Sequence, residues 1–133
     1  MAAQSIPPSD ALRVLVADDE PHIRRLLTTV LGNAAFRVDE AVDGREALER
    51  FESGTGYDCV ILDLMMPGAS GLEVLTRIRE HPERGNTPVV MLTAKGREAD
   101  RQAAYEGGAD DFLTKPFSPR KLISRIQEIV AER

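Results

Sequence analysis

The stretch CVILDLMMPG, residues 59–68, decides the fold of this chain. Its first four residues, Cys59–Leu62, are continuously apolar, as is typical of a strand that other elements cover on both faces. Asp63 follows the strand directly, and the turn residues Pro67 and Gly68 come soon after. In open α/β sheets, ligands bind outside the carboxyl ends of the strands. The stretch therefore predicts a buried strand of a parallel sheet with an acidic group at its ligand-binding end.

Other apolar runs lie on both sides of this strand. Arg13–Ala17 and Pro88–Leu92 are strong runs. Phe36–Ala41 and Phe112–Thr114 are weaker ones. Apolar residues at helical spacing fill the intervals between the runs. Strand and helix thus alternate five times, which predicts a single doubly wound α/β domain whose parallel sheet has helices on both faces.

Local signals mark several helix ends. Pro21 begins the first helical pattern, and Gly32 is expected to end it. Asp43 and Glu46 have the spacing of a capping box at the start of the second helix. The segment Ala99–Glu106 has only alanines and one tyrosine to bury, so it is expected to be the most weakly held helix and the easiest to move.

Length and composition argue against several classes of protein. The chain has 133 residues, room for one domain, and 42% of them are apolar. Its 17 basic and 22 acidic residues give a net charge of −5, which does not favour a protein that holds a phosphate backbone. Cys59 is the single cysteine, which argues against a disulfide scaffold and a structural zinc module.

The polar, proline-rich segment Met1–Asp10 is expected to be a disordered leader, with the folded domain at residues 11–133. The leader lacks the apolar stretch of a signal peptide, and no apolar run reaches the roughly 18 residues that span a bilayer. These features predict a cytoplasmic protein without a membrane segment.

Four of the predicted strands end in polar residues. Asp18 and Asp19 come after the first strand, and Asp63 comes after the third. Thr93 follows the fourth strand and Lys115 the fifth. The carboxyl ends of parallel strands share one edge of the sheet, so these five side chains are expected to face one crevice.

The chemistry of this set is coherent. Three clustered carboxylates repel one another, and Mg²⁺, which binds a few carboxylates and keeps several waters, would relieve that repulsion. A carboxylate can also attack phosphorus to form an aspartyl-phosphate. The charge of the incoming phosphoryl group would be neutralised by the metal and a lysine ammonium. The set thus predicts a Mg²⁺-dependent site that accepts a phosphoryl group.

Taken singly, the same residues have simpler interpretations. Asp18 and Asp19 before Pro21 would also balance the dipole of the helix that follows. Thr93 would also cap a helix, and Lys115 would be a surface lysine whose ammonium extends to water. Only the coincidence of polar residues at several strand ends favours the phosphoryl-acceptor site.

Four segments are similar to the signature segments of response-regulator receiver domains, the CheY-like modules of two-component signalling. They are VLVADDEP at residues 14–21, VILDLMMPGASG at 60–71, PVVMLTAK at 88–95 and GADDFLTKPF at 108–117. The resemblance runs from Arg13 to about Val130, and the last segment is most similar to receivers of the OmpR/PhoB type. It implies a flavodoxin-like (βα)5 fold with a five-stranded parallel sheet of order 2-1-3-4-5.

The resemblance also implies a role for each matching residue. Asp63 is the expected phosphoacceptor, Asp19 a direct Mg²⁺ ligand, and Asp18 a ligand that acts largely through water. The backbone carbonyl of Met65 is expected to complete the protein's share of the metal shell.

Three further residues are expected to respond to the phosphoryl group. Thr93 would turn its hydroxyl toward the group, and Lys115 would pair with it. Phe112 occupies the position of the switch aromatic, where relatives often have tyrosine, so this chain has no phenolic hydroxyl there. The Lys115–Pro116 bond is cis in relatives.

A receiver of this kind is a signalling switch rather than a turnover enzyme, although it catalyses its own phosphorylation and dephosphorylation. A sensor histidine kinase is the expected phosphodonor. Phosphorylation is expected to alter the surface formed by the helix at Ala99–Glu106, the last strand and the last helix. Contact with DNA is expected only through an output domain outside this sequence.

A symmetric dimer of the phosphorylated form is also expected on that surface, as in OmpR/PhoB relatives. Asp110 and Asp111 open the last strand and Arg125 lies in the last helix, so a two-fold axis would set acid against base. Lys121 departs from those relatives, which often carry an acid there, and it would face the like charge of Arg101. Dimerisation is therefore expected to be weaker than with a full set of pairs.

Two other functions fit this pattern less well. A phosphatase of the haloacid-dehalogenase kind also forms an aspartyl-phosphate, but its nucleophile lies on the first strand in a DxDx(T/V) motif, where this chain has ADDE. A flavodoxin-like nucleotide binder needs a glycine- or hydroxyl-rich loop after the first strand, where the sequence ADDEP would repel phosphate.

Overall fold

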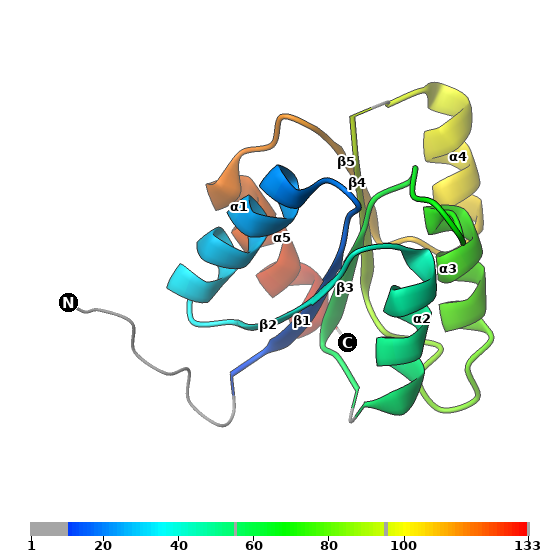
Figure 1. Cartoon of the computed structure of the whole chain (residues 1–133), viewed down its shortest axis with the longest axis horizontal. Helices are drawn as coiled ribbons and strands as arrows, with labels where there is room; N and C mark the ends of the chain where they lie inside the picture. The colour runs from blue at the N-terminus through cyan, green and yellow to red at the C-terminus, as the bar shows by residue number, and fades with distance from the viewer. Residues whose placement is uncertain (1–10, 55, 95, 133) are drawn as a thin grey trace.

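The computed structural model describes residues 11–54, 56–94 and 96–132, so the expected leader at residues 1–10 lies outside the described residues. Within these ranges, five strands and five helices alternate along the chain (Figure 1). In chain order they are β1 (Arg13–Ala17), α1 (Pro21–Asn33), β2 (Arg37–Ala41), α2 (Gly44–Ser53), β3 (Cys59–Leu62), α3 (Gly71–Arg79), β4 (Val89–Thr93), α4 (Glu98–Glu106), β5 (Asp111–Thr114) and α5 (Pro119–Ala131). Among these helices, none combines the length and the apolar composition that crossing a bilayer requires.

The strands form one parallel sheet of order β2-β1-β3-β4-β5, which confirms the order that the resemblance implies. The strand order reverses at β1, which pairs with β2 on one side and with β3 on the other. The register sets Ala17 opposite Leu62, and the Asp63 N–H donates to the Ala17 carbonyl at 3.0 Å. The residues that follow Ala17 and Leu62 therefore lie side by side at the carboxyl edge of the sheet.

Helices cover both faces of the sheet, as the continuously apolar strands predict (Figure 1). One core cluster joins alternate strand residues such as Leu15 and Leu62 to side chains of α2, α3 and α4. The other cluster joins Val16 and Ile61 to side chains of α1 and α5. These four strand residues are at most 1% exposed, so the centre of the sheet is buried on both faces.

The first helix begins at Pro21 as predicted but does not end at Gly32. It ends one residue later, at Asn33, with Ala34 as its C-cap, and Ala35 then takes a left-handed φ of 70°. The Phe36 N–H then bonds back to the Leu31 carbonyl at 3.1 Å. The predicted end is wrong because this closing bond, rather than the glycine, fixes where the helix stops.

The start of α2 has half of the predicted capping box. The Asp43 side chain accepts a hydrogen bond from the Glu46 N–H at 2.8 Å. The Glu46 carboxylate, however, accepts from the Val42 N–H instead of from Asp43. The helix therefore begins where the sequence predicts, while the reciprocal bond comes from one residue earlier.

Among the described helices, α4 has the fewest buried residues, since Ala104 alone is buried. Its C-terminal end is tied to α3 by Arg79, whose guanidinium donates to the Gly108 carbonyl and, at 3.1 Å, to the Asp110 carboxylate. The helix is thus anchored at its C-terminal end and weakly packed along the rest of its length, as its low apolar content predicts. That it moves at low cost stays a prediction.

Candidate functional site

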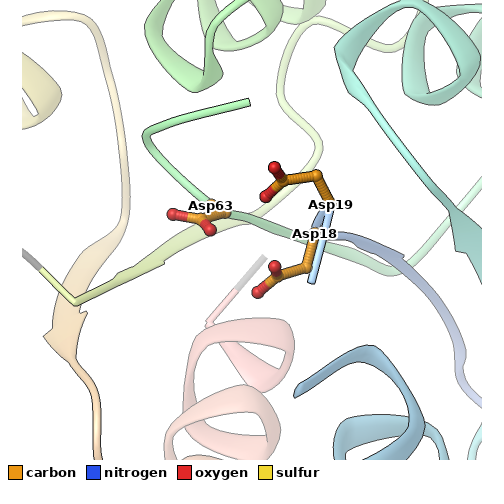
Figure 2. A group of neighbouring side chains, drawn as sticks. All are labelled: Asp18, Asp19 and Asp63. Atoms are coloured by element: carbon orange, nitrogen blue, oxygen red, sulfur yellow. The ribbon is translucent and has the colours of Figure 1, made fainter. Parts of the chain in front are cut away.

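Three carboxylates meet at the carboxyl edge of the sheet (Figure 2). Asp18 and Asp19 follow β1, Asp63 follows β3, and one oxygen from each lies within 4.8 Å of the others. Asp18 and Asp63 are only 2% and 7% exposed, whereas Asp19 is open to solvent. The cluster follows from the register of β1 and β3, which sets the residues after both strands at the same level.

A lysine ammonium compensates part of this charge. Lys115, just after β5, places its Nζ 2.8 Å from Asp18 Oδ2 and 3.1 Å from Asp63 Oδ2. Its side chain therefore passes the end of β4, which lies between β5 and β3 in the sheet. The ammonium thus bridges two carboxylates. Because the lysine side chain is only 12% exposed, water reaches this bridge poorly.

Burial and crowding perturb the ionisation of the cluster. Burial, and then the neighbouring charge of Asp18, raise the pKa of Asp63 above its ordinary value, with Lys115 acting against both. Burial alone would lower the pKa of Lys115, but the hydrogen bonds and charges of the two acids raise it, so the ammonium stays charged. Three acids and one ammonium leave a negative site that a further cation would neutralise.

Hydrogen bonds fix two of the three carboxylates. Asp18 Oδ1 accepts from the Glu20 N–H at 2.9 Å. Asp63 Oδ1 accepts from the Met65 N–H at 3.3 Å. Within the described residues, the Asp19 carboxylate makes neither a hydrogen bond nor an ion pair. One open carboxylate beside two fixed ones suits a hard cation that keeps several of its waters, so the residues fit the Mg²⁺ that the resemblance implies.

The other predicted site residues lie at the end of β4, within β5 and in the turn after Asp63. Thr93 ends β4 and is 1% exposed, and Met65 is an exposed residue of the turn after Asp63. Phe112 in β5 is buried in the core cluster that includes side chains of α4. The Lys115–Pro116 peptide bond is cis.

Glycine at the first position of α3 lets that helix begin against the site. A Cβ atom on Gly71 would overlap with the carbonyl oxygen of Asp63. A complete capping box of Ser70 and Glu73 fixes the same helix start, and Gly68, whose φ is 80°, allows the preceding turn. The turn after Asp63 is thereby held between β3 and α3.

The acids expected at a dimer interface are engaged within the chain. Arg125 Nε lies 2.6 Å from Asp111 Oδ2, and the Tyr105 hydroxyl donates to Asp111 Oδ1 at 3.0 Å. Asp110 forms an ion pair with Arg79 at 3.1 Å. Burial alone would raise the pKa of Asp111, but the hydrogen bonds that it accepts, first of all from Arg125, lower it. Asp111 thus links α4, β5 and α5 of one chain.

The other two residues expected at that interface are exposed. Arg101 lies on α4 with its guanidinium 5.5 Å from the centre of the Tyr105 ring. Lys121 lies on α5 near the helix start. Neither forms an ion pair with another residue in the described part of the chain, so both charges stay open to a partner.

Sequence reasoning missed three residues of this region. Arg24 in α1 donates to the Asp18 carbonyl at 2.8 Å, Arg79 anchors the end of α4, and Tyr105 binds Asp111. Arginine and tyrosine on the boundary of an amphipathic helix are too common to be singled out by their position alone. Only the folded arrangement shows what they contact.

A doubly wound parallel sheet with clustered acids and a lysine at its carboxyl edge defines an α/β protein with an acidic site suited to a cation. Comparisons narrow this class. The family described as the response regulator receiver domain matches residues 14–127. The transcriptional regulatory protein SrrA of Staphylococcus aureus is 44% identical over 117 residues, which cover 88% of this chain and 47% of that protein. The chain thus spans about half the length of the curated relatives it matches.

Solved structures agree with that match. A putative response regulator from Chloroflexus aurantiacus J-10-fl has a TM-score of 0.87 and 35% identity, covering 92% of this chain and 99% of its own. The chemotaxis protein CheY4 of Vibrio cholerae has a TM-score of 0.83 and 33% identity, covering 90% and 98%. The chain therefore belongs to the family of response regulator receiver domains of two-component systems. The closer likeness to OmpR/PhoB-type receivers stays a prediction.

Proposed function

We propose that this receiver domain accepts a phosphoryl group on the Asp63 carboxylate from a sensor histidine kinase, with Mg²⁺ bound in the acidic cluster. The main support is the bridge formed by Lys115 Nζ, which lies 2.8 Å from Asp18 and 3.1 Å from Asp63. Asp19 remains open beside it. A fixed cation, a buried nucleophile and an open carboxylate together are what phosphoryl transfer to an aspartate needs.

The acids divide the work of holding the metal. Asp19 and Asp63 would bind Mg²⁺ directly, Asp18 would act largely through water, and Met65 would contribute its main-chain carbonyl. When bound, the ion relieves the repulsion among the acids and neutralises oxygens of the incoming phosphoryl group. Asp18 is held at both carboxylate oxygens, by the Glu20 N–H and by Lys115, which suits a ligand that acts through water.

Asp63 supplies the attacking oxygen. Its carboxylate forms the new bond to phosphorus while the bond from phosphorus to the kinase histidine nitrogen breaks. Lys115 then exchanges its contact with Asp63 for one with a phosphoryl oxygen, and the Thr93 hydroxyl donates to another. The ends of β4 and β5 thus respond to the new charge.

Phe112 connects these strand ends to the outer surface. It lies three residues before Lys115 in sequence and packs in the same core cluster as Ala104 of α4. Because Ala104 is the one buried residue of that helix, a change at Thr93 and Lys115 can shift α4 at low cost. The surface of α4, β5 and α5 would therefore differ between the two states.

Wild-type protein is expected to take up one phosphoryl group from acetyl phosphate only when Mg²⁺ is present. Intact mass spectrometry measures the uptake, and EDTA should abolish it because the unshielded acids repel the donor. Mn²⁺, which also prefers oxygen ligands, is expected to restore it. Equal uptake in EDTA would contradict the role of the metal, and a label on a histidine of this chain would contradict the acceptor.

Phosphorylation is also proposed to promote a symmetric dimer through the α4, β5 and α5 surface. Arg125 already pairs with Asp111 of its own chain, so cross-chain pairing has to exchange this bond for an equivalent one. Such an exchange contributes little to the free energy of dimerisation, since exposed ion pairs are worth only about 0.2–1 kcal/mol each. Lys121 facing Arg101 of the second copy weakens the association further.

Arg125→Glu is therefore expected to leave activated protein monomeric, because it sets like charges against each other in both the in-chain and the cross-chain pair. Light scattering with beryllofluoride and Mg²⁺ measures the apparent mass over a concentration series. Lys121→Glu is the matched variant, and it should dimerise more strongly than the wild type because it sets an acid against Arg101. Wild type that stays monomeric throughout when activated would rule out the dimer.

A further inference from the structure

We propose that Arg24 is a positioning residue, which fixes the peptide unit between Asp18 and Asp19 and thereby orients the Asp19 carboxylate for Mg²⁺. The inference rests on the proposed function, because it concerns the metal of that site.

Arg24 reaches the acidic cluster from the first turn of α1. Its Nη1 donates to the main-chain carbonyl of Asp18 at 2.8 Å, and its Nε donates to the Glu40 carboxylate at 3.2 Å. The Arg24 side chain is 16% exposed, whereas that of Glu40 is 44% exposed. A largely buried arginine side chain thus directs its donors to the turn that carries two of the acids and to the strand beside it.

A hydrogen bond that holds the Asp18 carbonyl also limits where the backbone of Asp19 can lie. A peptide unit is planar, so a bond that holds the Asp18 oxygen also fixes the plane that ends at the Asp19 Cα. On the other side, the Asp18 N–H donates to the Ala41 carbonyl at 3.2 Å. The turn is therefore anchored to β2 twice, once directly through the main chain and once through Arg24 and Glu40.

Asp19 depends on this anchoring more than Asp18 does. The Asp18 side chain is held by the Glu20 N–H and by the Lys115 ammonium. The Asp19 carboxylate has no such contact within the part of the chain that the structure describes, so the backbone alone sets its direction. Groups that orient metal ligands in this way typically change metal affinity by about 10- to 100-fold.

Charge and positioning predict opposite effects when Arg24 is removed. The guanidinium is positive and close to the acids, so by charge alone it disfavours the binding of a cation. If charge decided the outcome, Arg24→Gln would bind Mg²⁺ more tightly than the wild type. If Arg24 positions Asp19, the same variant binds Mg²⁺ more weakly, and the sign of the change separates the two roles.

The test is a Mg²⁺ titration of the unphosphorylated full chain, followed through amide chemical shifts of the turn between β1 and α1. Arg24→Gln is expected to weaken Mg²⁺ binding roughly tenfold. Arg25→Gln is the matched control, because Arg25 is exposed on the same turn of α1 and its loss removes the same charge. That control should bind Mg²⁺ as the wild type does or slightly more tightly.

Unchanged or tighter Mg²⁺ binding by Arg24→Gln overturns the inference. If circular dichroism shows that this variant is unfolded, Arg24→Lys decides instead, because it keeps the charge but cannot reach both Asp18 and Glu40. Weaker binding by Arg24→Lys supports positioning, and wild-type affinity overturns it. A wild-type chain that binds no Mg²⁺ contradicts the proposed function itself, so the two failures are distinguishable.

Discussion

Asparagine in place of Asp63 is expected to reduce phosphorylation by acetyl phosphate, and modification by beryllofluoride, to below detection. The amide has nearly the shape of the carboxylate, so the almost fully buried position is filled as before, but it offers no anionic oxygen to attack phosphorus. Intact mass spectrometry measures phosphorylation, and fluorine NMR measures the bound beryllofluoride.

A second acid serves as the control for this variant. Asp100→Asn removes one carboxylate in the first turn of α4, outside the cluster, and it should be phosphorylated to the wild-type extent. If Asp63→Asn were phosphorylated as strongly as the wild type, another residue would have to be the acceptor.

Asp63→Asn is also expected to be more stable than the wild type when both are measured without metal at pH 7. Burial and Asp18 raise the pKa of Asp63, so the folded state favours the protonated acid over the ionised one. The stability that the protonated acid contributes is lost as the pH rises through the raised pKa, and at pH 7 the ionised carboxylate is a cost to the fold. Asparagine avoids this loss, while Lys115 keeps Asp18 as a partner. We expect a gain of about 1 kcal/mol, or roughly 3–5 °C in melting temperature for a chain of 133 residues. Thermal unfolding in EDTA measures it, and the gain should shrink as the pH falls toward 4.

Much of the fold could be predicted because strands buried on both faces leave a continuous apolar signature. Cys59–Leu62 shows this most clearly, and the structure buries all four of its residues. The proximity of Asp18 and Asp63 was predictable for a related reason, since residues that directly follow paired parallel strands take their places from the register. The end of α1 was not predictable, because the hydrogen bond from the Phe36 N–H that closes the helix depends on a left-handed Ala35.

The partners of charged side chains were harder to predict than the strands. Asp111 and Arg125 were expected to pair across a dimer, yet they lie 2.6 Å apart within one chain. The sequence positions of Asp111 and Arg125 cannot distinguish a pair within one chain from a pair across a dimer, because both pairings offer the same hydrogen bonds. Arg24 gave no signal for a different reason, since its contact with the acidic site is to a main-chain carbonyl, a group that every residue has.

Methionine in place of Lys115 is expected to have the largest effect on stability. It leaves the buried carboxylates of Asp18 and Asp63 without their cation, and removing one partner of a buried ion pair typically costs about 3–5 kcal/mol. The raised pKa of Lys115 means that its contribution is complete at pH 7 and is lost only as the pH rises through that pKa. Urea unfolding in EDTA measures the loss, and Lys121→Met on the exposed surface should stay within about 0.5 kcal/mol of the wild type.

Mg²⁺ should restore part of that stability, and phosphoryl acceptance should survive without its effect on the surface. A divalent ion among the acids replaces some of the lost positive charge, so it is expected to stabilise Lys115→Met more than the wild type. Beryllofluoride should still bind, because Asp63 and the acids around it are intact. The amide shifts of Phe112 and α4 should nevertheless move less than in the wild type, because no ammonium follows the new charge. If they moved equally, Lys115 would be a counter-ion of the resting state alone, and Thr93 would have to carry the change from Asp63 to α4.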